Sequence, residues 1–113
     1  MNEITRAYLV EILERIARIQ DYTQDGEAAF LADLRTQDAV LRNFEVIGEI
    51  VKRLDKGFVE QNPQIAWRSM AAFRDVIIHD YEDIRLDVIW QTIVQDLPPL
   101  RDALNTILND SDI

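Results

Sequence analysis

Apolar residues recur at intervals of three and four along nearly the whole of this 113-residue chain, and no stretch alternates as a β-strand does. Only three glycines and three prolines interrupt the pattern, so there are few places where a helix must end. The pattern therefore predicts an all-α protein. Because helices joined by short loops pack beside one another, we expect an antiparallel bundle of four to five helices.

Stripes and capping residues locate the elements of the N-terminal half. We expect a first helix over residues 3–22 and a short second helix over residues 26–34. A third helix is expected to begin at an N-cap Thr36 and to run to Leu54. Turn chemistry is expected over residues 56–64.

The C-terminal half is expected to hold two more helices. In Asn62-Pro63 the asparagine can cap a helix and the proline can take its first position, which predicts a fourth helix to residue 79. Residues 80–85 are expected to form a turn or a fraying helix end. A fifth helix would begin at an N-cap Asp87 and be kinked or restarted at Pro98-Pro99.

Length and composition indicate a single domain over residues 1–113. Cysteine is absent and only scattered carboxylates accompany one histidine, so we expect no disulfide, no metal site and no cofactor. Neither a secretory signal nor a long uncharged apolar run is readable, which predicts a cytoplasmic protein without a membrane span.

The chain is strongly acidic, with 21 Asp and Glu against 12 Lys and Arg, for a net charge of -9. Phosphate contacts dominate nucleic-acid affinity, so this balance counts against strong non-specific binding of RNA or DNA. Any contact with RNA is expected to be weak, salt-sensitive and confined to a small cleft.

Two features suggest close packing and self-association. The stripes hold more apolar residues than a four-helix core of this size needs, which favours a homodimer. Gly48 lies inside the expected third helix, where glycine costs about 1 kcal/mol against alanine. Gly48 therefore predicts a close helix–helix approach, either in the core or at a dimer contact.

One constellation carries chemistry: Arg74, His79 and Tyr81, with Asp75 beside the arginine. A purely structural interpretation is open, because a histidine can favour a helix C-terminus and an arginine can pair with a surface carboxylate. Residues seven apart return to nearly the same azimuth, so Arg74 and Tyr81 share a face if the helix continues that far.

His79 and Arg74 lie about 140° apart around one helix, so they converge poorly on a phosphate within one chain. Two copies of the helix meeting across a dyad would bring them together. RNA cleavage suits such a pair, since histidine can accept or donate a proton near neutral pH and arginine can stabilise charge on phosphate oxygens. Neither role requires a metal.

The spacing Arg74-x4-His79-x-Tyr81 resembles the signature of HepT, the toxin of the HepT/MntA toxin–antitoxin pairs, within the HEPN class of helical domains. Residues 36–43 running into Ile47-Gly48-Glu49 resemble the third helix of that family. The segments 63–68 and 88–100 resemble the entry to its motif helix and its last helix. The likeness covers nearly the whole chain in the same order.

The resemblance implies a HEPN-like bundle that forms a two-fold homodimer, with Arg74 and His79 as the catalytic pair of a metal-independent endoribonuclease. It also implies the toxin of a type VII-like pair, whose RNA substrate could be tRNA or mRNA. An MntA-like minimal nucleotidyltransferase would neutralise it by transferring AMP to Tyr81. The family often has a polar residue such as asparagine where this chain has Asp75, which could orient His79 one turn away.

Two alternatives remain open. A non-catalytic helical dimer could bind and regulate the nucleotidyltransferase, although such a scaffold would not need the arginine–histidine pair. A helical module could instead bind a nucleotide, with Trp67 and Trp90 stacking on its base, but aromatic residues at helical spacing more often belong to the core.

Overall fold

The computed structural model describes residues 1–110, and in this range it contains helices and no strand. In chain order the elements are α1 (Glu3–Tyr22), α2 (Glu27–Ala32), α3 (Leu34–Arg53), α4 (Lys56–Gln61), α5 (Trp67–His79), the 3₁₀ turn η1 (Tyr81–Asp83), α6 (Leu86–Gln91), the π-helical turn η2 (Thr92–Asp96) and α7 (Leu97–Asp110). The all-α prediction is confirmed.

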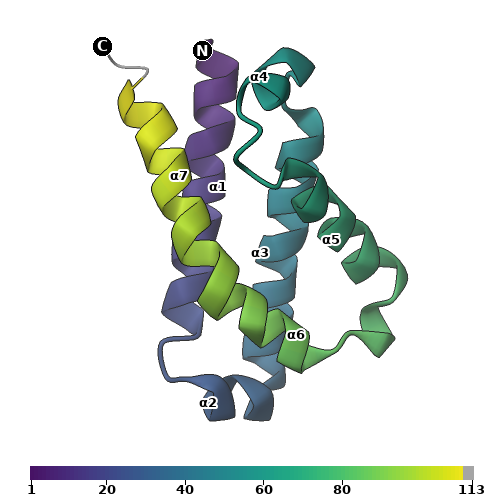
Figure 1. The fold of residues 1–113 in the computed structure, drawn as a ribbon. Helices are drawn as coiled ribbons and strands as arrows, with labels where there is room; N and C mark the ends of the chain where they lie inside the picture. The colour runs from purple at the N-terminus through teal and green to yellow at the C-terminus, as the bar shows by residue number, and fades with distance from the viewer. Residues whose placement is uncertain (111–113) are drawn as a thin grey trace.

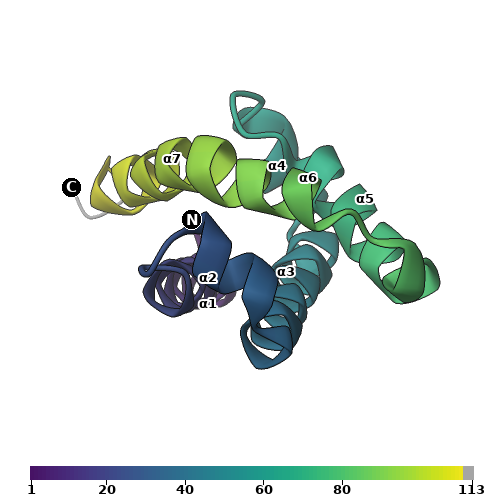
Figure 2. The ribbon, with the colours of Figure 1, turned by 90° about the horizontal axis from the view of Figure 1, so that it is seen from below.

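Four long helical units give the fold its shape, and successive units run in opposite directions (Figure 1). The helices α1 and α3 pack side by side, and α7 returns along α1. In Figure 2, α6 and α7 lie on one side of the α1–α3 pair, whereas α5 projects away from α1. The partner of α5 is α3, which leaves much of the surface of α5 uncovered.

The core forms where the stripes predicted it. In α1 the side chains of Leu9, Ile12, Ile16 and Ile19 are fully buried. The longest run of buried residues belongs to α3, which contacts α1 on one side and α5 on another. This central position makes α3 the support on which α5 rests.

The N-terminus of α3 differs from the prediction. Asp33, not Thr36, is the N-cap, since its carboxylate accepts a hydrogen bond from the backbone N–H of Arg35 at 3.0 Å. The Thr36 hydroxyl donates to the same carboxylate at 2.8 Å, so it supports the cap from the first turn. The helix consequently begins at Leu34, and α2 ends at Ala32, two residues earlier than predicted.

The segment expected to form turns contains a short helix instead. Asp55 caps α4 by accepting a hydrogen bond from the N–H of Phe58 at 3.1 Å. Asn62 ends α4, and its side-chain amide donates to the carbonyl of Phe58 at 2.9 Å. The prediction that Asn62-Pro63 starts the fourth helix is therefore wrong, and α5 begins at Trp67.

The last helical unit is continuous from α6 to α7 through η2. Asp87 lies in the first turn of α6 and pairs with the guanidinium of Arg85 at 2.7 Å, so the prediction of Asp87 as N-cap is wrong. The π turn immediately precedes Pro98-Pro99, and the N–H of Leu97 donates to the carbonyl of Thr92. The wider turn accommodates prolines that lack N–H donors, which explains why the helix continues past them.

Gly48 lies at the closest approach of α3 and α5. A Cβ atom at this position would stand 2.2 Å from the Cβ of Arg74 and 2.9 Å from the carbonyl oxygen of Met70. No pair of helices carrying side chains at this point could approach so closely. The predicted close approach is confirmed, and it is a contact within one chain.

We therefore expect Gly48→Ala to destabilise the protein by roughly 2 kcal/mol, because overpacking a helix contact forces a backbone shift. Thermal or urea unfolding measures this change. Gly57→Ala is the matched control, since a Cβ there meets only the tip of the Asp55 side chain, at 3.1 Å. A Gly48→Ala protein as stable as the wild type would contradict the role of this contact.

Candidate active site on helix α5

The helix α5 carries Arg74 and His79 on different sides. The Cβ and Cγ atoms of Arg74 lie over Gly48, so this side chain faces α3. His79, the last residue of α5, is exposed, and its side chain has no hydrogen bond or ion pair with any residue of the described range 1–110. The two side chains diverge within one chain, in agreement with the angle predicted from their spacing.

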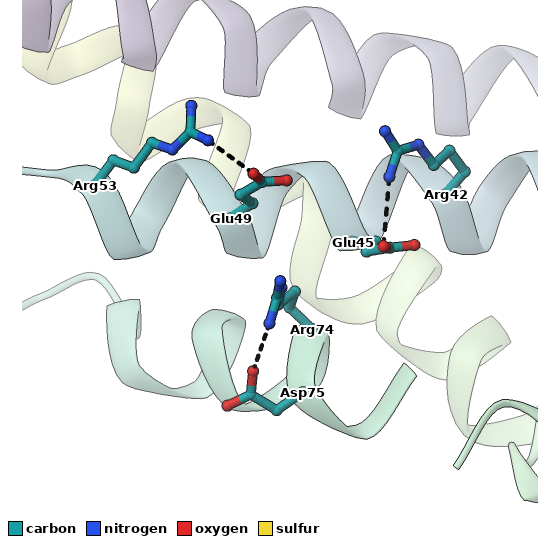
Figure 3. Close-up of polar contacts among 6 residues, drawn as sticks. All are labelled: Arg42, Glu45, Glu49, Arg53, Arg74 and Asp75. Atoms are coloured by element: carbon teal, nitrogen blue, oxygen red, sulfur yellow. Dashed lines mark hydrogen bonds and ion pairs between the residues drawn. The ribbon is translucent and has the colours of Figure 1, made fainter. Parts of the chain in front are cut away.

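Arg74 is held between two helices, and Figure 3 shows its guanidinium pointing from α5 toward α3. The side chain is 27% exposed, and Nη1 donates to the carboxylate of Asp75 at 3.1 Å. Its Nε is buried and has no acceptor among the described residues. The guanidinium therefore retains donors that the chain does not use.

Two glutamates of α3 flank the position of Arg74 in Figure 3. Glu45 pairs with Arg42 at 3.3 Å, and Glu49 pairs with Arg53 at 2.8 Å. Each glutamate is thus balanced by an arginine of its own helix. These pairs reduce the negative potential around Arg74, which the sequence composition had not indicated.

Asp75 has a different role from the predicted one. Its carboxylate accepts hydrogen bonds from Lys52 of α3 and from Arg74, and none from His79. These bonds, from Lys52 first and then Arg74, hold the pKa of the Asp75 carboxyl below its usual value. Asp75 therefore supports the arginine and not the histidine.

Three polar side chains of α3 that face the motif escaped the sequence analysis. Asp38, Glu45 and Lys52 stand at seven-residue intervals, which places them along one side of α3 toward α5. The seven-residue spacing is visible in the sequence and lies beside Gly48. Nothing in the sequence, however, indicated that these residues contact residues 74–81. Of the cations near the motif in sequence, Arg85 is engaged by Asp87.

Tyr81 lies beyond the end of α5, in η1, yet its side chain returns to α3. Its hydroxyl donates a hydrogen bond to the carboxylate of Asp38, and the side chain is 49% exposed. This carboxylate, together with partial burial, raises the pKa of the Tyr81 phenol above its usual value. Tyr81 and Arg74 thus both face α3, while His79 does not.

The surface of α5 opposite α3 is partly apolar. Ala72, Val76 and His79 recur at intervals of four and three and are exposed, with Val76 at 50%. Ile78, on the flank, is 40% exposed. An exposed apolar stripe next to a candidate catalytic histidine is a natural contact surface.

A cavity of about 490 Å³ lies between α5 and the α6–α7 unit, lined by Phe44, Phe73 and Leu97 among others. Neither tryptophan lines this cavity. Trp67 packs against Phe58, its indole N–H donating to the carbonyl of Asn62, and Trp90 packs against Phe30. Both tryptophans belong to the packing of the bundle, which removes the basis for a stacked nucleotide.

In the range 1–110, no three or more His, Asp or Glu side chains gather so that they could hold a metal ion. Within the same range, no helix combines the length and the apolar character that a membrane crossing requires.

The comparisons with known proteins identify the family. The family model described as "Ribonuclease HepT-like" matches residues 12–107, which include the whole of α5 and η1. The chain belongs to the HepT-like family. The resemblance inferred from the motif is thereby confirmed, and with it the HEPN-like character of the bundle. No solved structure matches the chain significantly.

Three relatives illustrate how far the HepT-like similarity extends. A protein of Methanocaldococcus jannaschii named "Putative RNase" is 41% identical over 106 residues, covering 93% of this chain and 88% of the relative. A Thermococcus cleftensis protein named "Probable ribonuclease HepT" is 38% identical over 102 residues, covering 89% and 93%. A further "Putative RNase", from Caldanaerobacter subterraneus subsp. tengcongensis, is 34% identical over 107 residues, covering 91% and 93%.

The Asp75 contacts predict a pH dependence. The folded pKa of this carboxyl lies below the unfolded value of 3.8, so its stabilising contribution is present above pH 3.8 and is lost as the pH falls through the folded pKa. We expect Asp75→Asn to be less stable than the wild type at pH 7, and the difference in unfolding free energy to be smaller at pH 3 than at pH 7. Urea unfolding at both pH values tests this.

Glu14→Gln serves as the control for that experiment, because it removes an exposed carboxylate that has no side-chain partner in the described chain. If wild type and Asp75→Asn differed in unfolding free energy by the same amount at every pH, this would contradict the proposed support of Arg74 through Lys52 and Asp75.

Proposed function

We propose that this HepT-like protein is a metal-independent endoribonuclease in which Arg74 and His79 perform the reaction. The observation that carries the proposal is the contrast between the two side chains. Arg74 is positioned by Asp75 and by packing on Gly48, with unused guanidinium donors, and His79 is exposed without a partner in the described chain. A positioned phosphate-binding cation beside an unengaged proton-transfer group suits RNA cleavage.

The reaction is attack of a ribose 2′-oxygen on the neighbouring phosphorus. The bond from the 2′-oxygen to phosphorus forms, the bond to the 5′-oxygen breaks, and a 2′,3′-cyclic phosphate and a 5′-hydroxyl result. His79 accepts the proton of the 2′-hydroxyl or donates one to the leaving oxygen. Arg74 stabilises the negative charge that develops on the phosphate oxygens.

A two-fold dimer completes this site. Within one chain His79 points away from Arg74, so a phosphate held by Arg74 needs a histidine from elsewhere. The stripe of Ala72, Val76 and His79 offers a contact surface on α5, which packs on its other side against α3. Two copies of α5 meeting along this stripe would place His79 of each protomer near the other protomer, as two-fold symmetry requires.

Regulation is proposed to act through Tyr81. As the toxin of a type VII-like pair, the protein would be neutralised when an MntA-like nucleotidyltransferase transfers AMP from ATP to the Tyr81 hydroxyl. Tyr81 is half exposed and faces α3, as Arg74 does. An added nucleotide and its phosphate charge at this position would compete with RNA for Arg74 and repel its backbone.

The charge distribution supports a selective enzyme. The chain has a net charge of -9, and the cations available to RNA near the motif are few. Phosphate contacts would be limited to the cleft, so RNA binding would be weak and would fall with salt along a shallow slope, because few counterions are released. A structured substrate such as a tRNA, or an exposed segment of an mRNA, would meet this requirement.

We expect the purified chain to cleave total RNA or tRNA in the presence of a chelator and to leave cyclic-phosphate ends. His79→Ala should reduce the rate by at least roughly 100-fold, the usual effect of losing an acid–base group. Arg74→Gln should have an effect of about the same size, since it removes transition-state charge stabilisation. Gel assays with end-group analysis measure both.

Arg101→Gln is the control for Arg74→Gln, since Arg101 lies on α7 and pairs with its neighbour Asp102. Equal inactivity of the wild type and both variants, with Tyr81 free of adducts by intact mass, would contradict the ribonuclease proposal. That outcome would favour the non-catalytic dimer that regulates a nucleotidyltransferase.

A second prediction concerns a composite site, meaning a site built from residues of both protomers. If each site takes Arg74 from one protomer and His79 from the other, mixing Arg74→Gln with His79→Ala restores activity. Half of a random mixture is heterodimer with one intact site of two, so about a quarter of the wild-type rate is expected. Rate measurements after refolding the two variants together test this.

Val76→Glu, introduced into both variants, should abolish the recovery because a charge on the stripe opposes the dimer. Val10→Glu is the matched control, since Val10 is 40% exposed on α1, away from α5. An absence of recovery in the mixture, with both single variants dimeric by ultracentrifugation, would contradict the composite site.

A further inference from the structure

Tyr81 is the one side chain of η1 that is bonded to another helix in the described structure. Its hydroxyl donates to the carboxylate of Asp38, which lies 43 residues earlier on α3. The antiparallel packing of α3 and α5 brings these residues together, since Gly48 faces Arg74 and the chain then continues toward the N-terminal part of α3. The contact joins a phenol to a carboxylate at a surface that a second molecule can reach.

We infer that Asp38 is the general base for group transfer onto Tyr81, an inference that rests on the modification of Tyr81 proposed above. The hydrogen bond already aims the phenolic proton at the Asp38 carboxylate. No rearrangement is needed before the proton moves. The nucleotidyltransferase would then supply the nucleotide and its activation, while this chain supplies both the nucleophile and its base.

The Tyr81 oxygen attacks the α-phosphorus of a nucleoside triphosphate, and a phenolic oxygen–phosphorus bond forms. The bond between the α-phosphorus and the oxygen that bridges to the β-phosphate breaks, and pyrophosphate leaves. The phenolic proton passes to the Asp38 carboxylate, so no free phenolate is required.

The surroundings explain why a base is needed. On α3, the groups that face Tyr81 are Asp38 and Glu45, and Glu45 is paired with Arg42. The residues around Tyr81 on its own segment are acidic: Asp80, Glu82 and Asp83. The hydrogen bond to Asp38, partial burial and the negative charges of Asp38 and Glu45 disfavour the phenolate and raise the pKa of Tyr81. The neutral phenol must therefore lose its proton during the transfer.

A purely structural role is the competing explanation, in which the bond merely fixes η1 on α3. The two roles differ in their dependence on pH. A tyrosine without a base reacts through its phenolate, whose abundance rises about tenfold per pH unit below a pKa near 10. A tyrosine paired with an ionised carboxylate reacts at a rate that is nearly independent of pH in the neutral range.

The chain contains an internal reference for this test. Tyr22 is 44% exposed, close to the 49% of Tyr81, and its side chain has no hydrogen bond in the described structure. We would treat the whole protein with adenosine 5′-phosphorimidazolide, which carries AMP on an imidazole leaving group. Peptide mass spectrometry then gives the ratio of labelling at Tyr81 to labelling at Tyr22 between pH 6.5 and 9. Taking the ratio cancels the pH dependence of the reagent.

We expect Tyr81 to be labelled at least roughly tenfold faster than Tyr22 at pH 7, with a ratio that falls as the pH rises. Asp38→Asn keeps an oxygen that accepts the hydrogen bond but cannot take the proton, so its ratio should drop close to one at every pH. Asp83→Asn is the matched control, since it removes an equal charge two residues from Tyr81 without breaking a side-chain bond, and it should retain the wild-type ratio.

An Asp38→Asn protein with the wild-type ratio and pH profile would overturn the inference, as would a wild-type ratio near one throughout. Neither RNA nor a partner protein enters this experiment. A ribonuclease assay without activity would therefore not affect the labelling result. A negative labelling result would likewise not affect the ribonuclease proposal, which its own assay tests.

Discussion

The rest of the site depends on the close approach of α3 and α5 at Gly48. A Cβ at this position would stand 2.2 Å from the Cβ of Arg74, so only glycine lets the two helices meet there. The close approach fixes the position of Arg74 against α3 and brings Lys52 within hydrogen-bonding distance of Asp75. It also sets where η1 returns to α3, which places Tyr81 against Asp38. Arginine, its support and the tyrosine are thus positioned by one steric constraint.

Electrostatics then decide what this geometry can do. The chain is strongly acidic overall, yet the carboxylates around Arg74 are individually balanced: Glu45 by Arg42, Glu49 by Arg53 and Asp75 by Lys52. A local cation with unused donors can persist in an acidic protein when its neighbours are paired in this way. Around Tyr81, in contrast, the hydrogen bond to Asp38, partial burial and the charges of Asp38 and Glu45 raise the pKa of the phenol. The two ends of the motif therefore lie in opposite electrostatic settings.

The errors in predicting helix boundaries have a common physical origin. Asp33 and Thr36 are both residues that can cap a helix N-terminus, and so are Asp55 and Asn62, yet sequence spacing does not say which of them takes that position. In the structure Asp33 caps α3 and Asp55 caps α4, whereas Thr36 bonds to the Asp33 carboxylate and Asn62 lies at the C-terminal end of α4. The outcome depends on where the apolar stripe of the helix meets its neighbour. The disturbance expected at Pro98-Pro99 takes the form of a π turn just before them, over Thr92–Asp96, and the helix continues through it into α7.

The sequence by itself determined the class of the fold, the four long helices, the need for glycine at position 48, and the resemblance to the HepT-like family, which the family model over residues 12–107 confirms. Each of these follows from the order and spacing of residues along the chain, which can be read without knowing which residues they contact in the fold. Only the tertiary structure decided that Asp75 serves Arg74 through Lys52, that Tyr81 is bonded to Asp38, and that His79 stands apart from both. These relations join residues on different helices, and periodicity along a chain records which side of a helix a residue occupies but not what it meets there.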